Sequence, residues 1–185
     1  GWSLDLDSTV FQRSGHQEGA ERGYNPWRPG RHTHHPLLAV LAEAPMILHG
    51  WLRSGKAGSA RGVVPFLQEA RALMPADWRL RTVRADSGFF DQALLGFLEG
   101  RSLPYIIVAR MTRTLKAAAA SIKDCTPLDA HYSTASFQLQ LHGWSKPRRF
   151  VVIRELERED KSAVGHRLIE VPGYTYRIFV TNRDE

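Results

Sequence analysis

The sequence predicts an α/β fold, and three features of its apolar pattern support this prediction. Residues 2–109 contain, in order, three strands, a helix, a strand, a helix and a strand. Both helical segments have one apolar face, as helices that pack on a sheet do. The last strand, Tyr105–Ala109, is apolar throughout, which is typical of a strand buried on both faces. This order of elements indicates helices packed on a central sheet.

The first strand opens the chain and has one apolar and one polar face. Apolar residues at positions 2, 4 and 6 alternate with polar ones, so Asp5 and Asp7 share the polar face. The segment 11–34 is polar and rich in glycine, proline and arginine, which predicts an extended loop without regular structure. Two apolar runs, Leu37–Ala42 and Met46–Leu52, then predict a hairpin.

Two amphipathic helices alternate with the next strands. Because Pro65 is tolerated only in the first turn of a helix, the first helix starts near Gly62. Its apolar face consists of Val63, Phe66, Leu67, Ala70, Leu73 and Met74. Arg79–Ala85 predicts a strand that ends at Asp86, and Ser87-Gly88 predicts a sharp turn into the second helix. The apolar stripe of that helix consists of Phe89, Phe90, Ala93, Leu94, Phe97 and Leu98.

After Arg110 the pattern changes from α/β to mostly strand. Arg113–Lys123 predicts a short, alanine-rich helix. Alternating stretches then predict antiparallel strands at Ser136–His142, Arg149–Glu157, Arg167–Val171 and Tyr176–Thr181.

Composition narrows the class of protein. The net charge of +6 and the pI of about 9.8 favour a polyanion such as nucleic acid as partner. The single cysteine, Cys125, excludes an intrachain disulfide framework and a cysteine-rich zinc site, in agreement with a reducing cytoplasm. The most apolar segment, Pro36–Leu52, is interrupted by Glu43, Pro45 and His49, so it does not predict a membrane span. No signal peptide is visible, and we expect a cytoplasmic protein.

Two aspartates stand where chemistry is expected in such a sheet. Asp7 lies on the polar face of the first strand, and Asp86 lies at the carboxyl end of a later strand, where binding sites of α/β sheets form. Two converging carboxylates suit hard divalent cations, which can activate a nucleophile at a phosphodiester. The alternative interpretation is local, because aspartate before serine or glycine often caps a turn or a helix.

Several sequence blocks resemble those of bacterial insertion-sequence DDE transposases, in the same order and with the same spacing. The block from Gly23 to Leu38 is the most specific, because it is long and chemically unusual. The blocks are Asp7–Thr9, Gly23–Pro26 with Pro29–Arg31, His35–Leu38, Ala85–Phe90 and Tyr176–Asn182.

This resemblance implies a ribonuclease H-like fold with a mixed sheet ordered 3-2-1-4-5 and with Asp7 and Asp86 on neighbouring strands. It implies that residues 1–112 form the first part of the catalytic core and that residues 113–175 form a β-rich insertion. Residues 176–185 would be the strand that returns to the core. By position Asp7 matches the family's first catalytic aspartate, and Asp5 is the second choice.

The family's third carboxylate is a glutamate on a helix that follows the strand ending in Val-Thr-Asn. Here the sequence stops at Glu185, before such a helix, so we expect the third carboxylate beyond Glu185 and expect these residues alone to be inactive. Glu99 lies at the tail of a helix, far from the expected strand ends. The acidic side chains expected on a solvated face are Glu155, Glu157, Glu159 and Asp160.

Basic and aromatic residues provide candidate DNA contacts. In the loop these are Arg22, Tyr24, Trp27, Arg28 and Arg31, a mixture that stacks on bases and binds phosphates. An equally open interpretation is that the aromatics pin the loop to the core. Lys146, Arg148 and Arg149 indicate a basic hairpin tip, either at DNA or simply solvated. His32, His34 and His35 lack partners at ligand spacing, so surface or hydrogen-bonded histidines are favoured over a metal site.

Together these features predict a DNA transposase that hydrolyses phosphodiesters at transposon ends and transfers the strand to target DNA. The resemblance implies Mg²⁺ or Mn²⁺ as cofactor, and transposon-end and target DNA as partners of a protein that works at the bacterial nucleoid, with a homodimer as one arrangement in the DNA complex. One alternative is a ribonuclease H-like nuclease without strand transfer. The other is a DNA-binding module of the same fold without chemistry.

Overall fold

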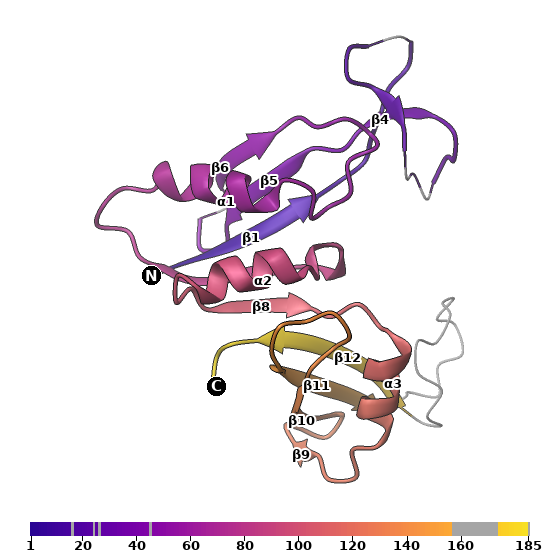
Figure 1. Ribbon diagram of the computed structural model, residues 1–185, viewed down its shortest axis with the longest axis vertical. Coiled ribbons are helices and arrows are strands. Elements are labelled where there is room, and N and C mark those ends of the chain that lie inside the picture. Colours follow the sequence, from indigo (N-terminus) through magenta and orange to yellow (C-terminus); the bar gives the residue numbers. More distant parts are fainter. Residues whose placement is uncertain (16, 24, 26, 45, 157–173, 185) are drawn as a thin grey trace. The chain divides into compact units, whose positions relative to one another are not determined.

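The computed structural model describes residues 1–15, 17–23, 25, 27–44, 46–156 and 174–184. The chain divides into two compact units, Gly1–Ile107 and Val108–Glu185 (Figure 1). No helix among these described residues is long and apolar enough to cross a membrane.

The first unit is built on a mixed sheet. Its strands are β1 (Trp2–Ser8), β5 (Leu37–Leu41), β6 (Met46–Trp51), β7 (Leu80–Ala85) and β8 (Tyr105–Val108). They lie in the order β6-β5-β1-β7-β8. β1 pairs antiparallel with β5 and parallel with β7, and β7 pairs parallel with β8. Numbered along the chain, this order is 3-2-1-4-5, so the predicted strand order is confirmed.

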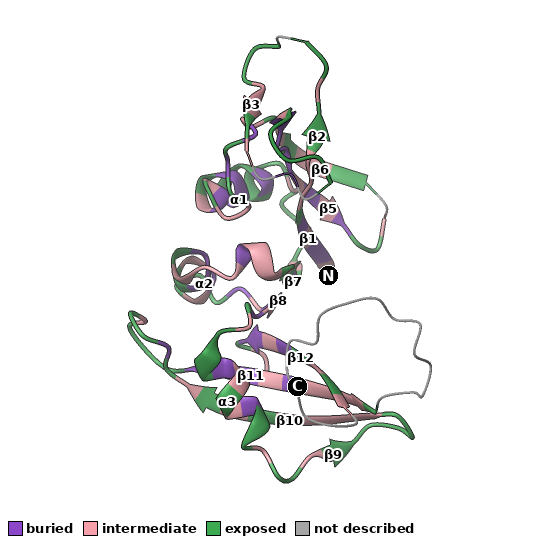
Figure 2. Ribbon diagram, turned by 90° about the vertical axis from the view of Figure 1, so that its right-hand side faces the viewer, coloured by how far each residue is buried: buried purple, intermediate pink, exposed green. Residues whose placement is uncertain are grey.

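Alternating side chains decide which face of each strand is buried. Leu4 and Leu6 of β1 are buried, as are Leu37, Ala39 and Leu41 of its neighbour β5 (Figure 2). Asp7, by contrast, is exposed. The apolar face therefore forms the core of the first unit, and Asp7 is directed away from it.

The helices of the first unit are α1 (Val63–Ala72) and α2 (Gln92–Glu99). α1 follows Gly62, whose φ of 74° suits glycine, and it holds Pro65 in its first turn as predicted. The predicted start of the second helix was wrong. A short 3₁₀ turn, η1 (Ser87–Phe89), comes first, and α2 begins only after Asp91. The Asp91 carboxylate accepts hydrogen bonds from the backbone amides of Ala93 and Leu94. Asp91 is therefore a strong N-cap, and the helix begins after it and not at Phe89.

The polar segment after β1 contains a small sheet that the sequence analysis did not predict. It consists of β2 (Phe11–Gln12), β4 (His32–His34) and β3 (Glu21–Arg22), in the order β2-β4-β3, with antiparallel pairing. Irregular backbone was expected there because of the glycines and prolines. The described part of residues 23–31 does lack strand and helix, so the prediction fails at residues 11–12, 21–22 and 32–34.

The second unit contains α3 (Arg113–Ala120), β9 (Thr126–Pro127), β10 (Tyr132–Leu139), β11 (Arg148–Leu156) and β12 (Tyr174–Thr181). Its strands are antiparallel in the order β12-β11-β10-β9, as the alternating pattern predicted. The strand expected at Ser136–His142 begins earlier, at Tyr132, and the strand expected at Arg167–Val171 lies outside the described residues. That residues 113–175 are an insertion into a catalytic core stays a prediction.

Candidate metal and DNA site

The two candidate aspartates occupy neighbouring positions at the ends of two adjacent parallel strands. In the register between β1 and β7, Leu6 stands opposite Ala85, so Asp7 and Asp86 come next on the two chains. The backbone of Asp86 is still extended, with φ −77° and ψ −179°. Adjacent strands lie about 4.8 Å apart, and both aspartates are exposed. The register therefore places the two aspartates at neighbouring backbone positions at the ends of the strands.

Each of these carboxylates makes one local hydrogen bond. One oxygen of Asp7 accepts from the Ser8 amide at 2.7 Å. One oxygen of Asp86 accepts from the Gly88 amide at 2.9 Å and caps η1. The capping role that the sequence left open for Asp86 is thus present. The cap uses one of the two carboxylate oxygens of Asp86, so it does not exclude a second role for this side chain.

A salt bridge distinguishes Asp5 from Asp7. The guanidinium of Arg84 donates to both oxygens of Asp5, each at 2.6 Å. The hydrogen bonds to Asp5 raise the pKa of Arg84 above its usual value. Asp5 and Arg84 are opposite each other in the register of β1 and β7, so their side chains lie on the same face of the sheet. Asp7 and Asp86 lie two residues further along the same strands and hence on the same face. Because Asp5 is engaged by Arg84, Asp7 is the better candidate ligand.

The adjacent histidines His34 and His35 are hydrogen-bonded, one of the two arrangements favoured from the sequence, and they are buried, so the other arrangement, a surface position, is wrong for them. His34 donates from Nε2 to the Glu18 carbonyl and accepts at Nδ1 from Arg13. His35 Nδ1 lies 2.5 Å from the Ala57 carbonyl, and its Nε2 lies 2.6 Å from Ser8 Oγ. Both rings thus have structural partners.

Within the described residues, no group of three or more His, Cys, Asp or Glu side chains could hold a metal ion. Glu99 accepts a hydrogen bond from the Tyr105 hydroxyl, and Glu155 accepts one from the Tyr132 hydroxyl. The remaining acidic candidates lie outside the described residues: Glu157, Glu159, Asp160 and Glu185.

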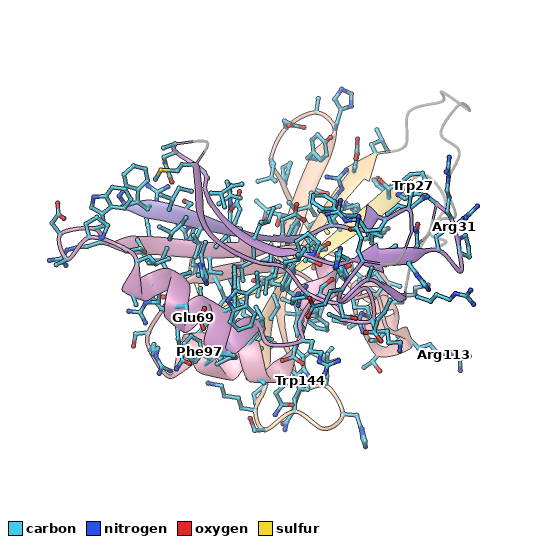
Figure 3. The ribbon with its side chains drawn as sticks, turned by 90° about the horizontal axis from the view of Figure 1, so that it is seen from above. Trp27, Arg31, Glu69, Phe97, Arg113 and Trp144 are labelled. Atoms are coloured by element: carbon cyan, nitrogen blue, oxygen red, sulfur yellow. The ribbon has the colours of Figure 1, made fainter. Side chains whose placement is uncertain are left out.

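The end of β3 and the loop after it present arginines and one tryptophan to solvent. Arg22, Arg28 and Arg31 are exposed, and Trp27 is 87% exposed (Figure 3 labels Trp27 and Arg31). Tyr24 lies outside the described residues. The interpretation that aromatics pin this loop to the core is therefore wrong for Trp27.

Asn25 holds the turn instead. It is buried, and its side-chain oxygen accepts from the amides of Trp27 and Arg28, both at 3.0 Å. Such a turn fixes the backbone while the indole stays in solvent. An exposed aromatic on a fixed turn is suited to stacking on a base.

The basic hairpin tip differs from the sequence expectation. Arg148 is only 4% exposed, and its guanidinium lies over the Trp144 ring at 4.6 Å. Arg149 donates to the Arg183 carbonyl. Arg148 was expected at the surface because it lies in a run of basic residues, but the ring of Trp144 covers it. Lys146 is the exposed basic side chain of the three.

Comparison with known families decides the class of this chain. The sequence model of the family described as Transposase DDE domain group 1 matches residues 3–182. The chain belongs to this DDE transposase family. The resemblance to DDE transposases that the sequence blocks indicated is confirmed. The search of curated proteins found no match.

A solved structure supports the ribonuclease H-like fold expected of a DDE transposase. The chain is similar to a piggyBac transposase in a synaptic complex with hairpin DNA, with a TM-score of 0.57 and 14% identity. The similarity covers 100% of this chain and 34% of that one, so the chain spans about a third of the length of that relative.

Several residues near the aspartates were missed by sequence reasoning. Ser8 and His35 occur within the recognised blocks, but the contact between them connects segments far apart in the sequence. Arg53 and Ser59 occur in no recognised block. An arginine that follows an apolar strand is ordinarily solvated, so the pattern contained no signal for Arg53.

Proposed function

We propose that this chain is the catalytic part of a DNA transposase and that Asp7 and Asp86 hold its divalent cation, Mg²⁺ or Mn²⁺. The reaction would be hydrolysis of a phosphodiester at the transposon end, followed by transfer of the freed 3′ strand to target DNA. The observation that carries the proposal is the juxtaposition of Asp7 and Asp86 on one face of two parallel strands, in a member of the DDE transposase family.

The residues present fit such a cation. Mg²⁺ prefers carboxylate oxygens, and it keeps several waters, which requires an exposed site. Asp7 and Asp86 are exposed, and each uses one oxygen in a local bond. A divalent cation held there by Asp7 and Asp86 would supply activation of a water or hydroxyl nucleophile and stabilisation of the leaving oxygen.

The protein side chains have distinct tasks in this proposal. Asp7 and Asp86 supply the ligand oxygens. Arg84 forms a salt bridge with Asp5. The carboxylate of Asp5, which lies beside the site, is thereby neutralised and does not repel DNA phosphates. The guanidinium groups of the exposed loop bind phosphates, for which their planar geometry is suited. Trp27 stacks on a base.

DNA binding can be tested by replacing Arg22, Arg28 and Arg31 together with alanine. We expect weaker binding to all sequences alike. The slope of log affinity against log salt should decrease by up to about 2.7, because each phosphate contact contributes about 0.9.

The matched control replaces three exposed arginines outside this loop, Arg71, Arg79 and Arg81, and so changes the net charge equally. If both triple variants lose the same affinity, net charge and not the loop explains binding. An affinity that does not change with salt would contradict phosphate contact altogether.

Catalysis is tested with the full-length gene product on transposon-end DNA and a target plasmid. We expect cleavage and strand-transfer products with Mg²⁺ or Mn²⁺, both lost in Asp7→Asn and in Asp86→Asn. Cleavage without strand transfer would indicate a nuclease, and DNA binding without either product would indicate a binding module. Activity that survives both substitutions would overturn the site assignment.

A further inference from the structure

A short loop, residues 54–61, contacts both backbone segments that carry the candidate ligands. The Ser59 hydroxyl lies 3.4 Å from the Ser8 hydroxyl, directly beside Asp7. On its other side Ser59 packs against Gly88 in the turn capped by Asp86. A Cβ atom at Gly88 would lie 2.7 Å from Ser59 Oγ. Ser59 is therefore a spacer between the two strand ends.

His35 connects this loop to the end of β1. Its Nδ1 must donate to the Ala57 carbonyl at 2.5 Å, because a carbonyl only accepts. In the neutral ring, Nε2 then accepts the Ser8 hydroxyl proton at 2.6 Å. The ring is buried, and its bond to the Ala57 carbonyl is shielded from water, while its bond to Ser8 is partly buried. The loop backbone at Ala57 and the strand residue next to Asp7 are thus fixed to one rigid ring.

Arg53 organises the rest of the loop. Its guanidinium donates to three loop carbonyls, Gly58 at 3.2 Å, Ser59 at 3.2 Å and Arg61 at 2.7 Å. It also donates to the His35 carbonyl at 3.0 Å and approaches Ser8 Oγ at 3.4 Å. Burial, and then the charge of Arg61, lower the pKa of Arg53, as expected for a guanidinium partly removed from water. One side chain therefore ties the loop to His35 and to Ser8 at the end of β1.

We propose that Arg53 and His35 are positioning residues, which set the separation of Asp7 and Asp86 through the loop 54–61. This inference rests on the proposed function, since it concerns the same metal-binding pair. The physical reason is that Mg²⁺ demands near-ideal geometry, and that a misplacement of about 1 Å can cost on the order of a hundredfold in rate. Asp7 and Asp86 are exposed and come just after the last residues that β1 and β7 pair with each other, so side-chain packing does not fix the distance between their carboxylates.

The chain contains a matched control for His35. His34 is also buried and also uses both ring nitrogens, but its partners are Arg13 and the Glu18 carbonyl, both in the loop between β2 and β3 of the small sheet. We expect His34→Ala and His35→Ala both to lower the melting temperature. Only His35→Ala should weaken Mn²⁺ binding, by about ten- to a hundredfold, the range for residues that orient metal ligands. Equal weakening in both variants would overturn the inference.

Milder substitutions cover the case in which His35→Ala does not fold. Arg53→Lys keeps the charge but loses the planar arrangement of donors that reaches the loop carbonyls, so we expect Mn²⁺ binding to weaken at least severalfold. Arg13→Lys, which affects the contacts of Arg13 with His34 and with the Phe11 ring, should leave it unchanged. If Arg53→Lys binds Mn²⁺ like the parent protein, the loop does not position the ligands.

The same titration separates this inference from the proposed function. If the parent protein binds Mn²⁺ and Asp7→Asn abolishes the binding, the metal site exists, and unchanged binding in the His35 and Arg53 variants then refutes the positioning role alone. If Asp7→Asn leaves Mn²⁺ binding unchanged, the proposed metal site itself is wrong.

Discussion

Gly88→Ala is expected to destabilise the protein because the added methyl group has no room. The new Cβ would lie 2.7 Å from Ser59 Oγ, 2.8 Å from Ser59 Cβ and 3.0 Å from Asp86 Oδ1. Overpacking of this kind typically costs about 1–3 kcal/mol. The Ser59 Cβ is fixed to the loop backbone, so rotation of the side chain cannot relieve the clash. We therefore expect a loss in the upper part of that range.

Gly96→Ala is the control, and it should raise the free energy of unfolding, whereas Gly88→Ala should lower it. Gly96 lies inside α2, and a Cβ there would meet no atom within 4 Å. Alanine in a helix interior gains roughly 0.5–1 kcal/mol over glycine. Denaturant unfolding of both variants measures the two free energies.

Ser59→Gly should restore part of the stability lost in Gly88→Ala, since it removes the obstructing side chain. A double-mutant cycle gives this coupling directly. The steric reasoning is refuted if Gly88→Ala is as stable as the parent protein, or if Ser59→Gly and Gly88→Ala prove additive.

Three further predictions concern charged side chains elsewhere. Arg84→Met should free Asp5 and raise Mn²⁺ affinity on the order of fivefold, because a positive charge near the site is lost; isothermal titration measures this, and unchanged or lower affinity would contradict it. The hydrogen bond from His49 lowers the pKa of Glu69 below its usual 4.5. The pair therefore stabilises the fold above about pH 4.5 and stops doing so as the pH falls through the lowered pKa. Unfolding curves of Glu69→Gln should accordingly differ from those of the parent protein at neutral pH and converge with them in acid. Arg148→Ala should cost about 1–3 kcal/mol because the side chain is buried, and thermal unfolding would show no change if it were a solvated DNA contact instead.

The strand order of the first unit and the neighbouring positions of Asp7 and Asp86 were implied by the family resemblance of the sequence blocks, whereas the two-faced character of β1 follows from the alternation within that strand. Alternation in β1 separates the aspartates from Leu4 and Leu6, and the blocks around Asp7 and Asp86 match those of a family with a known order of strands. Patterns of this kind are local, and the sequence shows them without knowledge of tertiary contacts.

Other features depend on contacts between distant segments and could not be predicted in this way. Arg148 stands in a basic run, yet it is buried under Trp144. Arg53 contacts four backbone carbonyls that no periodicity indicates. The late start of α2 is a local effect that the sequence analysis missed. The apolar residues before Asp91 were assigned to the helix, whereas Asp91 caps the helix and makes it begin after them.

The most direct test of the metal site is paramagnetic broadening of backbone amide signals during titration with Mn²⁺. The structure places Asp7 and Asp86 on one face of adjacent strands, so we expect the amides around both to broaden first and in parallel. Two carboxylates suffice for weak binding at a shared site, so this measurement does not depend on a third ligand. Asp7→Asn should abolish broadening around Asp86, and Asp86→Asn should abolish it around Asp7. Independent broadening of the two regions, or broadening centred elsewhere in the chain, would contradict a shared metal site.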